Sequence, residues 1–188
     1  MIAVFGEGRD MKPAHFALAL AVLVSGGGCL SQPPFQDPFT RPQIDWKPSL
    51  VLDVVQAERI LGSECRPERV TAYMDEGTKA YQSSFRDDRP DTATGRIGSL
   101  GYMYEEYQSA EVARLYLDST LRANRLSPED AIRMEGGAEL NYFTGGDVIR
   151  MVMILRENRL IRLKVNPVTS NYNIVEFRKV AAELAKQL

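Results

Sequence analysis

The chain has 188 residues, of which 23 are Lys or Arg, 25 are Asp or Glu and one is His. The net charge of −2 argues against a nucleic-acid partner, because proteins that bind phosphate backbones carry an excess of basic residues. The length suffices for one domain with its own hydrophobic core, and we expect a single domain.

An apolar run at residues 16–24 follows Lys12 and leads through Ser25 and three glycines to Cys29. A basic residue, a short apolar run and small residues before a cleavage point are typical of a signal peptide. The run is too short to span a bilayer as a helix. A signal n-region rarely carries acidic residues such as Glu7 and Asp10, so Met11, which is followed by Lys12, fits a signal start better than Met1. Residues 1–10 are therefore interpreted as a start-site artefact.

Since the small residues stand directly before the cysteine, this region resembles the lipobox of bacterial lipoprotein precursors, with Gly26 where that motif usually has a large aliphatic residue. The resemblance implies an envelope protein held in a membrane by a covalent lipid such as palmitate on Cys29, with no other cofactor. Because Leu30 follows the cysteine, enteric sorting rules favour the outer membrane in a Gram-negative host, with the domain in the periplasm. The predicted divisions are a signal peptide over 1–28, a tether over 29–48 and a domain over 49–188.

Cleavage before Cys29 would remove two basic and two acidic residues. The remaining chain would carry 21 basic and 23 acidic residues and therefore the same net charge. It would also remove His15, the only histidine, and with it any Ser-His or Cys-His catalytic pair and any imidazole metal ligand. Cys65 would then have no partner for an internal disulfide. We expect it to be buried as a small hydrophobe; the alternative is an exposed thiol that pairs between chains.

The predicted tether holds five of the ten prolines between residues 30 and 48, which favours an extended, polyproline-like segment. Phe39 and Trp46 would cover a little of the domain, or alternatively dock at the membrane interface. A short strand at 50–53 then leads to a helix with a capping box formed by Asp53 and Gln56 and a stop at Gly62. The expected buried stripe of this helix is Val54, Ala57, Ile60 and Leu61.

The next segments alternate apolar and polar residues and predict strands. Residues 70–74 and 78–82 flank a three-residue hairpin loop at 75–77, which would pair Ala72 with Ala80. Residues 85–98 are predicted to be a solvated loop and residues 99–107 a strand. Ser109 would cap a helix, and Pro128 would begin a second helix of one or two turns. Residues 138–143 are predicted to form another strand.

The clearest predicted strands are residues 148–155 and 159–165. A three-residue loop at 156–158, with Asn158 left-handed, would separate an apolar face from a face bearing the cations. A two-residue loop is rejected because it would mix Arg162 and Lys164 with Met151 and Met153. Asn173 would cap the last helix, with Glu176 completing a capping box. The predicted fold is α+β, a curved antiparallel sheet packed by helices in a single domain.

Two groups of side chains are candidate binding sites, whereas no catalytic residue and no metal site is predicted. The adjacent acids Glu105 and Glu106 point to opposite faces of a strand, one in solvent and the other at an edge, and cannot act together. A group of cations at one sheet face and hairpin tip would hold an anionic lipid head group, a glycan or an acidic protein. The alternative is that these cations belong to an ordinary solvated face of the sheet. Its members are Arg150, Arg156, Arg159, Arg162 and Lys164. An apolar pocket, unless these side chains are simply core, would be lined by Met151, Met153, Tyr102 and Tyr104.

Three functions remain open from the sequence. The leading hypothesis is a membrane-anchored, non-catalytic binding or scaffolding module that contacts an envelope protein. A carrier or sensor of a small hydrophobic or anionic ligand predicts a sizeable pocket between sheet and helix. A carboxylate-based hydrolase requires two carboxyl groups that converge in one cleft.

Overall fold

The computed structural model of the chain describes residues 41–188. The predictions for the signal peptide, for lipidation at Cys29 and for Phe39 lie outside the described residues.

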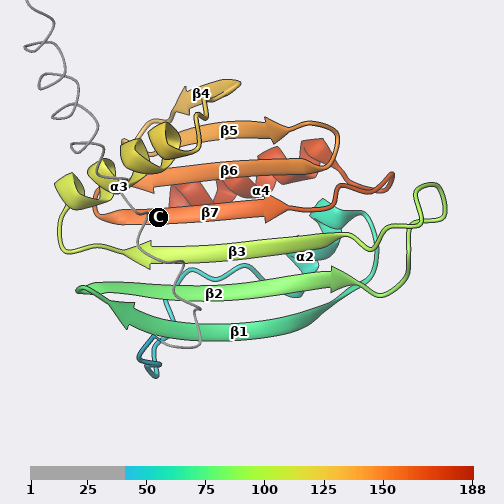
Figure 1. Ribbon diagram of the computed structural model, residues 1–188, viewed down its shortest axis with the longest axis horizontal. Helices are drawn as coiled ribbons and strands as arrows, with labels where there is room; N and C mark the ends of the chain where they lie inside the picture. Colours follow the sequence, from blue (N-terminus) through green and yellow to red (C-terminus); the bar gives the residue numbers. More distant parts are fainter. Residues whose placement is uncertain (1–40) are drawn as a thin grey trace, which may run out of the picture. The chain divides into compact units, whose positions relative to one another are not determined.

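Seven antiparallel strands form one open sheet in the order β1-β2-β3-β7-β6-β5-β4 (Figure 1). Strands that follow one another in the sequence are neighbours in the sheet, with the exception of β3 and β4, which lie apart. Strand β7 pairs with β3 in the middle of the sheet. The strands are β1 (Cys65–Asp75), β2 (Thr78–Asp87), β3 (Ser99–Glu106), β4 (Asp130–Arg133), β5 (Glu139–Gly145), β6 (Ile149–Arg156) and β7 (Arg159–Val165).

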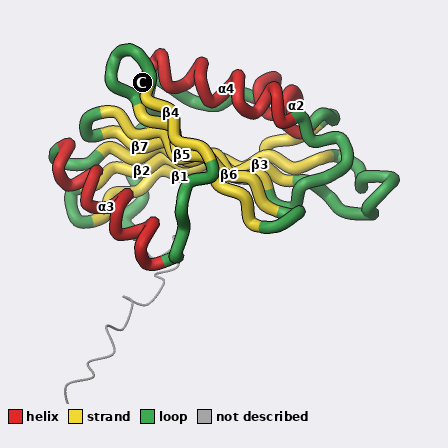
Figure 2. Tube along the Cα trace, turned by 90° about the horizontal axis from the view of Figure 1, so that it is seen from above, coloured by secondary structure: helices red, strands yellow, loops and turns green. Residues whose placement is uncertain are grey.

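Three helices pack on the two sides of the sheet (Figure 2). The helices α2 (Val54–Leu61) and α4 (Ile174–Gln187) cover one side, which we call the α2/α4 face. The helix α3 (Ala110–Ala123) lies at one end of the other side, the α3 face. The predicted α+β class, with helices on an antiparallel sheet, is confirmed.

The α2/α4 face carries the larger hydrophobic core. Tyr102 and Leu163 are fully buried partners across β3 and β7, and the Tyr102 hydroxyl donates to the backbone oxygen of Leu50 at 2.8 Å. The core residues predicted for the last helix are all buried here: Phe177, Val180, Ala181 and Leu184 in α4, and Leu188 directly after it. Each fully buried large apolar side chain contributes about 1.5–3 kcal/mol, so this layer dominates the stability of the fold.

A second core lies under α3, where Ala113 and Leu117 pack on Met153, Leu155 and Leu160. Strands β6 and β7 are therefore buried on both faces, and Val152, Met153, Ile154 and Leu155 are buried in succession. Strands covered on both sides lose the simple alternation of apolar and polar residues.

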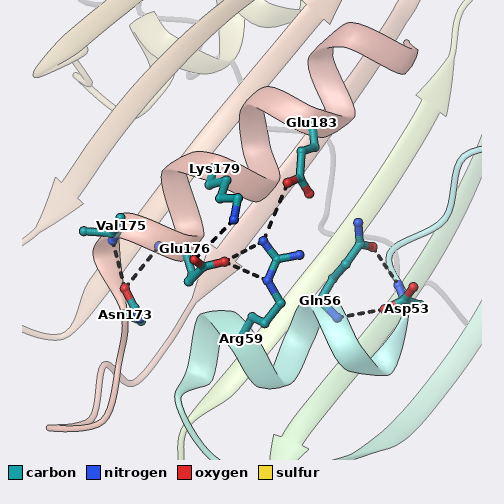
Figure 3. A network of polar contacts seen from close by, with 8 residues as sticks. All are labelled: Asp53, Gln56, Arg59, Asn173, Val175, Glu176, Lys179 and Glu183. Carbon is teal, nitrogen blue, oxygen red and sulfur yellow. Dashed lines mark hydrogen bonds and ion pairs between the residues drawn. The ribbon is translucent and has the colours of Figure 1, made fainter.

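The helix starts follow the local capping chemistry that the sequence predicts. Asp53 and Gln56 form the capping box of α2, which ends at Gly62 with φ 73°. Ser109 caps α3 and Asn173 caps α4. The capping box predicted for Glu176 is wrong, because its carboxylate instead accepts a 2.7 Å hydrogen bond from Arg59 of α2 (Figure 3).

This bond belongs to an ion-pair network that joins α2 to α4. The Arg59 guanidinium also lies 3.6 Å from Glu183, and Lys179 lies 3.7 Å from Glu176 (Figure 3). Together with the buried side chains beneath, the network fixes the two helices side by side on the sheet.

Both predicted hairpin loops are wrong by one residue. In the first, Glu76 and Gly77 form a two-residue turn with φ 46° and 79°, so Ala72 pairs with Tyr81 rather than with Ala80. In the second, the turn is Glu157 and Asn158, and the left-handed residue is Glu157 with φ 54°. Two-residue turns with a positive φ match the twist of antiparallel strands.

The second turn reverses the predicted faces of the last hairpin. Met153 pairs with Arg162 and Met151 with Lys164, which is the arrangement that the sequence argument rejected. The basic side chains of β7 therefore share the α3 face with the methionines.

Other local predictions also need correction. Residues 130–133 form the edge strand β4 rather than a helix, and residues 50–53 form no strand. Val54 is 38% exposed and does not join the buried stripe of α2. The loop predicted to be solvated contains Asp87, at the end of β2, and Asp91, and both are buried.

The packed domain begins before the predicted boundary at residue 49. The backbone nitrogen of Ile44 donates to Ala72 at 3.0 Å, and that of Met74 donates to Pro42 at 3.1 Å, so residues 42–44 pair with the outer edge of β1. Trp46 packs on Tyr104 with ring centroids 5.9 Å apart. The expectation that Trp46 covers part of the domain is confirmed.

Candidate functional site

The five cations predicted to form one group are distributed over both faces of the sheet. Arg162 and Lys164 lie on the α3 face, as the partners of Met153 and Met151. The other three cations, Arg150, Arg156 and Arg159, lie on the α2/α4 side. The register of the β6–β7 hairpin thus separates the predicted group.

Arg156 and Arg159 flank the hairpin turn as a directly opposed pair. Like charges that face each other across two strands destabilise a sheet. Arg159 lies 3.5 Å from the exposed carboxylate of Glu157, which offsets part of the repulsion.

The methionines and tyrosines predicted to line one pocket also lie on opposite faces. Tyr102 and Tyr104 belong to the α2/α4 core, whereas Met151 and Met153 belong to the layer under α3. Tyr102 and Met153 are fully buried in close-packed surroundings. The four side chains therefore share no pocket, which removes the geometry that the carrier hypothesis required.

A buried ion pair lies in the α3 face and was missed by sequence reasoning. Glu105, which was expected in solvent or at an edge, is only 6% exposed, and its carboxylate lies 3.2 Å from the guanidinium of Arg162. The Arg162 side chain also contacts the sulfur of Met103 and stacks over the ring of Tyr116 at 5.9 Å. Burial raises the pKa of Glu105, although the charge of Arg162 opposes this shift.

The surroundings of Glu105 explain the direction of this shift. Its neighbours along the same row of the sheet are Leu160, Ala80 and Tyr73, and all three are buried. A carboxylate in such surroundings loses its hydration, and one ion pair restores only part of that loss. Buried charges of this kind are found at functional sites as well as in structural networks.

The ion pair marks the boundary between a covered and an uncovered part of the α3 face. Among the residues that the structure describes, no helix lies over β1 and β2 on this side (Figure 1). The uncovered area is partly exposed and mostly polar, and we call it the open surface. Its residues, which follow one another across β1, β2, β3 and β7, are Thr71, Gln82, Ser84, Gly101, Met103 and Lys164.

Gly101 occupies the middle of the open surface, between Ser84 and Lys164. Neither backbone conformation nor crowding requires a glycine here, because its φ is not positive and an added Cβ would meet only the Lys164 carbonyl oxygen, at 3.8 Å. A glycine inside a central strand weakens the strand and often marks a place where a ligand or another backbone approaches closely. A single glycine inside a segment with the alternating pattern of a strand is the signal in the sequence that could have revealed the open surface.

Two other buried carboxylates, those of Asp91 and Asp87, accept hydrogen bonds on both of their oxygens. Asp91 accepts hydrogen bonds from Ala93, Thr94 and Ser170, two of them at 2.6 Å from the hydroxyl and the backbone nitrogen of Ser170. Asp87 accepts from Ser63 and from the backbone nitrogen of Gly98. Both side chains therefore fasten loops rather than offer free oxygens to a substrate.

Two further features bear on a binding role. No set of His, Cys, Asp and Glu side chains within residues 41–188 has the geometry of a metal site. In the same part of the chain, none of the helices has both the length and the apolar character needed to cross a bilayer. Cys65 is buried, as expected, and burial raises the pKa of its thiol to about 12.

Comparisons with known proteins give little guidance. No protein-family model matches the chain, and no curated protein matches it. Among solved structures, the chain is similar to the extracellular domain of PknH from Mycobacterium tuberculosis, with 8% sequence identity and a TM-score of 0.44. The match covers 73% of this chain and 91% of that domain. A TM-score below 0.5 is too low to establish a common fold.

Proposed function

We propose that the protein is a lipid-anchored module of the bacterial cell envelope that binds an envelope protein through the open surface and performs no chemistry of its own. The lipobox-like sequence at Cys29 supports the anchor. The loss of the only histidine with the signal peptide, and the hydrogen bonds that tie Asp87 and Asp91 to neighbouring loops, support a role in binding rather than in catalysis.

Gly101 is the observation that carries the binding role. The opposite side of the sheet is covered by two helices, whereas the open surface has a glycine at its centre and partly exposed Ser84 and Gln82 beside it. Lys164 adds an exposed positive charge at the border. An extended segment of a partner is able to approach the sheet most closely at Gly101, where there is no side chain to exclude it.

The anchor is tested by palmitate labelling and membrane fractionation of the wild-type chain beside Cys29→Ala. We expect label and membrane retention in the wild type and neither in Cys29→Ala. Cys65→Ser is the matched control and should keep both, because Cys65 is buried in the domain. A wild-type chain that stays unlabelled and soluble would show that the lipobox is not used.

The binding surface is tested by photo-crosslinking in cells from a probe placed at Ser84. A probe at Lys179, exposed on α4 on the opposite side of the sheet, is the control. We expect a specific crosslinked product from Ser84 that disappears when Gly101→Val is added. The Val side chain has room and favours strands, so the thermal stability should stay equal or rise. Unchanged crosslinking in Gly101→Val, or the same product from Lys179, would contradict the proposal.

A further inference from the structure

We propose that a second site, separate from the open surface, binds a small organic anion, meaning a carboxylate or phosphate joined to an apolar group. The site is a hollow at the edge of the sheet, and Arg150 and Tyr172 are the groups that recognise the charge. This inference does not depend on the proposed function, because it concerns other residues and a different kind of ligand.

The hollow forms where the sheet edge changes. Strand β4 pairs with β5 only as far as Tyr142, so Phe143 and Thr144 continue as an edge without β4. The start of α4 closes the hollow with Ile174 and Phe177. The enclosed part of the hollow is only about 20 Å³, and the rest of its space is open to solvent. Because typical drug-sized pockets hold roughly 300–1,000 Å³, only the charged head of a ligand would enter the hollow, and the rest of the ligand would lie on the surface beside it.

Tyr172 gives the hollow an unused hydrogen-bond donor. Its hydroxyl oxygen is buried and has no hydrogen-bond partner among the described residues. Burial raises the pKa of this phenol, although Arg150 and Arg178 oppose the shift, so the hydroxyl stays protonated and able to donate. A buried hydroxyl without a partner costs stability, and a ligand that accepts its hydrogen bond would recover that cost.

Arg150 gives the hollow a positive charge without a carboxylate partner. Its Nη1 donates to the backbone oxygens of Gly146, at 2.7 Å, and Ile149, at 2.9 Å, and within residues 41–188 it forms no ion pair. These two bonds hold the guanidinium in place and leave its other nitrogens available. A fixed guanidinium beside a phenol donor suits the planar oxygens of a carboxylate and the oxygens of a phosphate.

Two other charged groups lie at the hollow. Arg178 stacks on the ring of Tyr142 at 4.6 Å and binds Asp130 at 2.7 Å. Glu129 accepts a hydrogen bond from the Thr144 hydroxyl at 2.5 Å and keeps its negative charge. Arg150 is therefore the cation at the hollow that has no carboxylate partner among the described residues. Tyr142, Ile174 and Phe177, which also line the hollow, supply apolar surface for the apolar group of the ligand.

The experiment uses the full chain without its lipid, carrying Cys29→Ala, and three probes. These are inorganic phosphate, hexanoate, and vesicles of phosphatidylcholine with phosphatidylglycerol. Binding is measured by calorimetric titration for the soluble probes and by co-sedimentation for the vesicles. The variants are Tyr172→Phe and Arg150→Gln, and the matched control is Arg133→Gln, which removes a cation whose side chain is 79% exposed on β4.

We expect binding of at least one probe, unchanged in Arg133→Gln and weakened roughly tenfold or more in Tyr172→Phe and Arg150→Gln, as for a lost hydrogen bond to a charged group. Binding of hexanoate or phosphate would identify a soluble anion, whereas binding of vesicles alone would identify a lipid head group.

Without ligand, Tyr172→Phe should melt at the same or a higher temperature, because it removes only an unpartnered hydroxyl. A lower melting temperature would show that the hydroxyl is structural and overturn the proposal. Absence of binding to all three probes, or equal binding by Tyr172→Phe, would overturn it too.

Discussion

Arg162→Met tests whether Glu105 is held as a charge inside the α3 face. The substitution keeps a long side chain that can pack on Met103 and Tyr116 but leaves the carboxylate without its cation. Removing one partner of a buried pair costs about 3–5 kcal/mol. The Glu105 side chain is 8% exposed and that of Arg162 is 26% exposed, so we expect a loss near the lower limit, about 3 kcal/mol at pH 7.

The pH dependence of this loss identifies the group responsible. Because burial raises the pKa of Glu105 in the folded protein, its protonated form is favoured there. The stability linked to Glu105 is therefore fully present below the unfolded pKa of about 4.3 and is lost as the pH rises through the folded pKa. Arg162 opposes the rise, so the pKa increases further in Arg162→Met. The deficit relative to wild type should be largest at pH 7 and should shrink toward pH 5.

The assay is urea unfolding at pH 7 and pH 5, followed by the fluorescence of the single tryptophan, Trp46, which packs on Tyr104. Lys164→Met is the matched control, because Lys164 is an exposed cation on the same strand and face; its effect should stay within about 0.5 kcal/mol. Glu105→Gln added to Arg162→Met should restore most of the stability. A loss below about 1 kcal/mol in Arg162→Met that does not change with pH would refute a buried charge.

Three further outcomes follow from other contacts. Hydrogen bonds from Ser170 lower the pKa of Asp91, so its stabilising effect is present above about pH 4 and fades as the pH falls through the folded pKa. Asp91→Asn should therefore melt below wild type at pH 7, with a gap that narrows in acid; equal melting temperatures at pH 7 would contradict this. Arg59→Met should lower the melting temperature only slightly, because the pair with Glu176 is partly exposed to solvent, and high salt should remove most of the difference. A difference that persists in high salt would contradict screening. Cys65 should resist an aromatic disulfide reagent at pH 8 until urea unfolds the chain, whereas rapid reaction in buffer would show that the thiol is accessible.

Features that depend on neighbouring residues were predictable from the sequence. The starts of the helices at Asp53, Ser109 and Asn173 depend on a side chain two or three residues from the backbone group that it caps. The buried stripe of α4 follows from helical spacing alone. The α+β class followed from these elements, because an amphipathic helix must cover a sheet or another helix.

Features that depend on distant strands were not predictable in the same way. Strand β6 is buried on both faces, so Val152 and Met153 look equally suited to either side and the pattern does not fix a register. A short edge strand such as β4, whose residues are mostly exposed, carries no alternation either. The open surface depends on where α3 ends over the sheet, which no single segment of sequence records.

The register of the last hairpin illustrates the same limit most clearly. The sequence argument placed Arg162 and Lys164 on one face of the sheet and the methionines on the other, because charged side chains avoid an apolar face. In the structure, Glu105 on β3 supplies the missing partner, 57 residues away in the chain. In the register predicted with a three-residue loop, Arg162 would lie on the other side of the sheet and Glu105 would be buried alone, at a cost of several kcal/mol. We infer that the charge that appears to break the pattern of β7 is one of the groups that specify its alignment with β3.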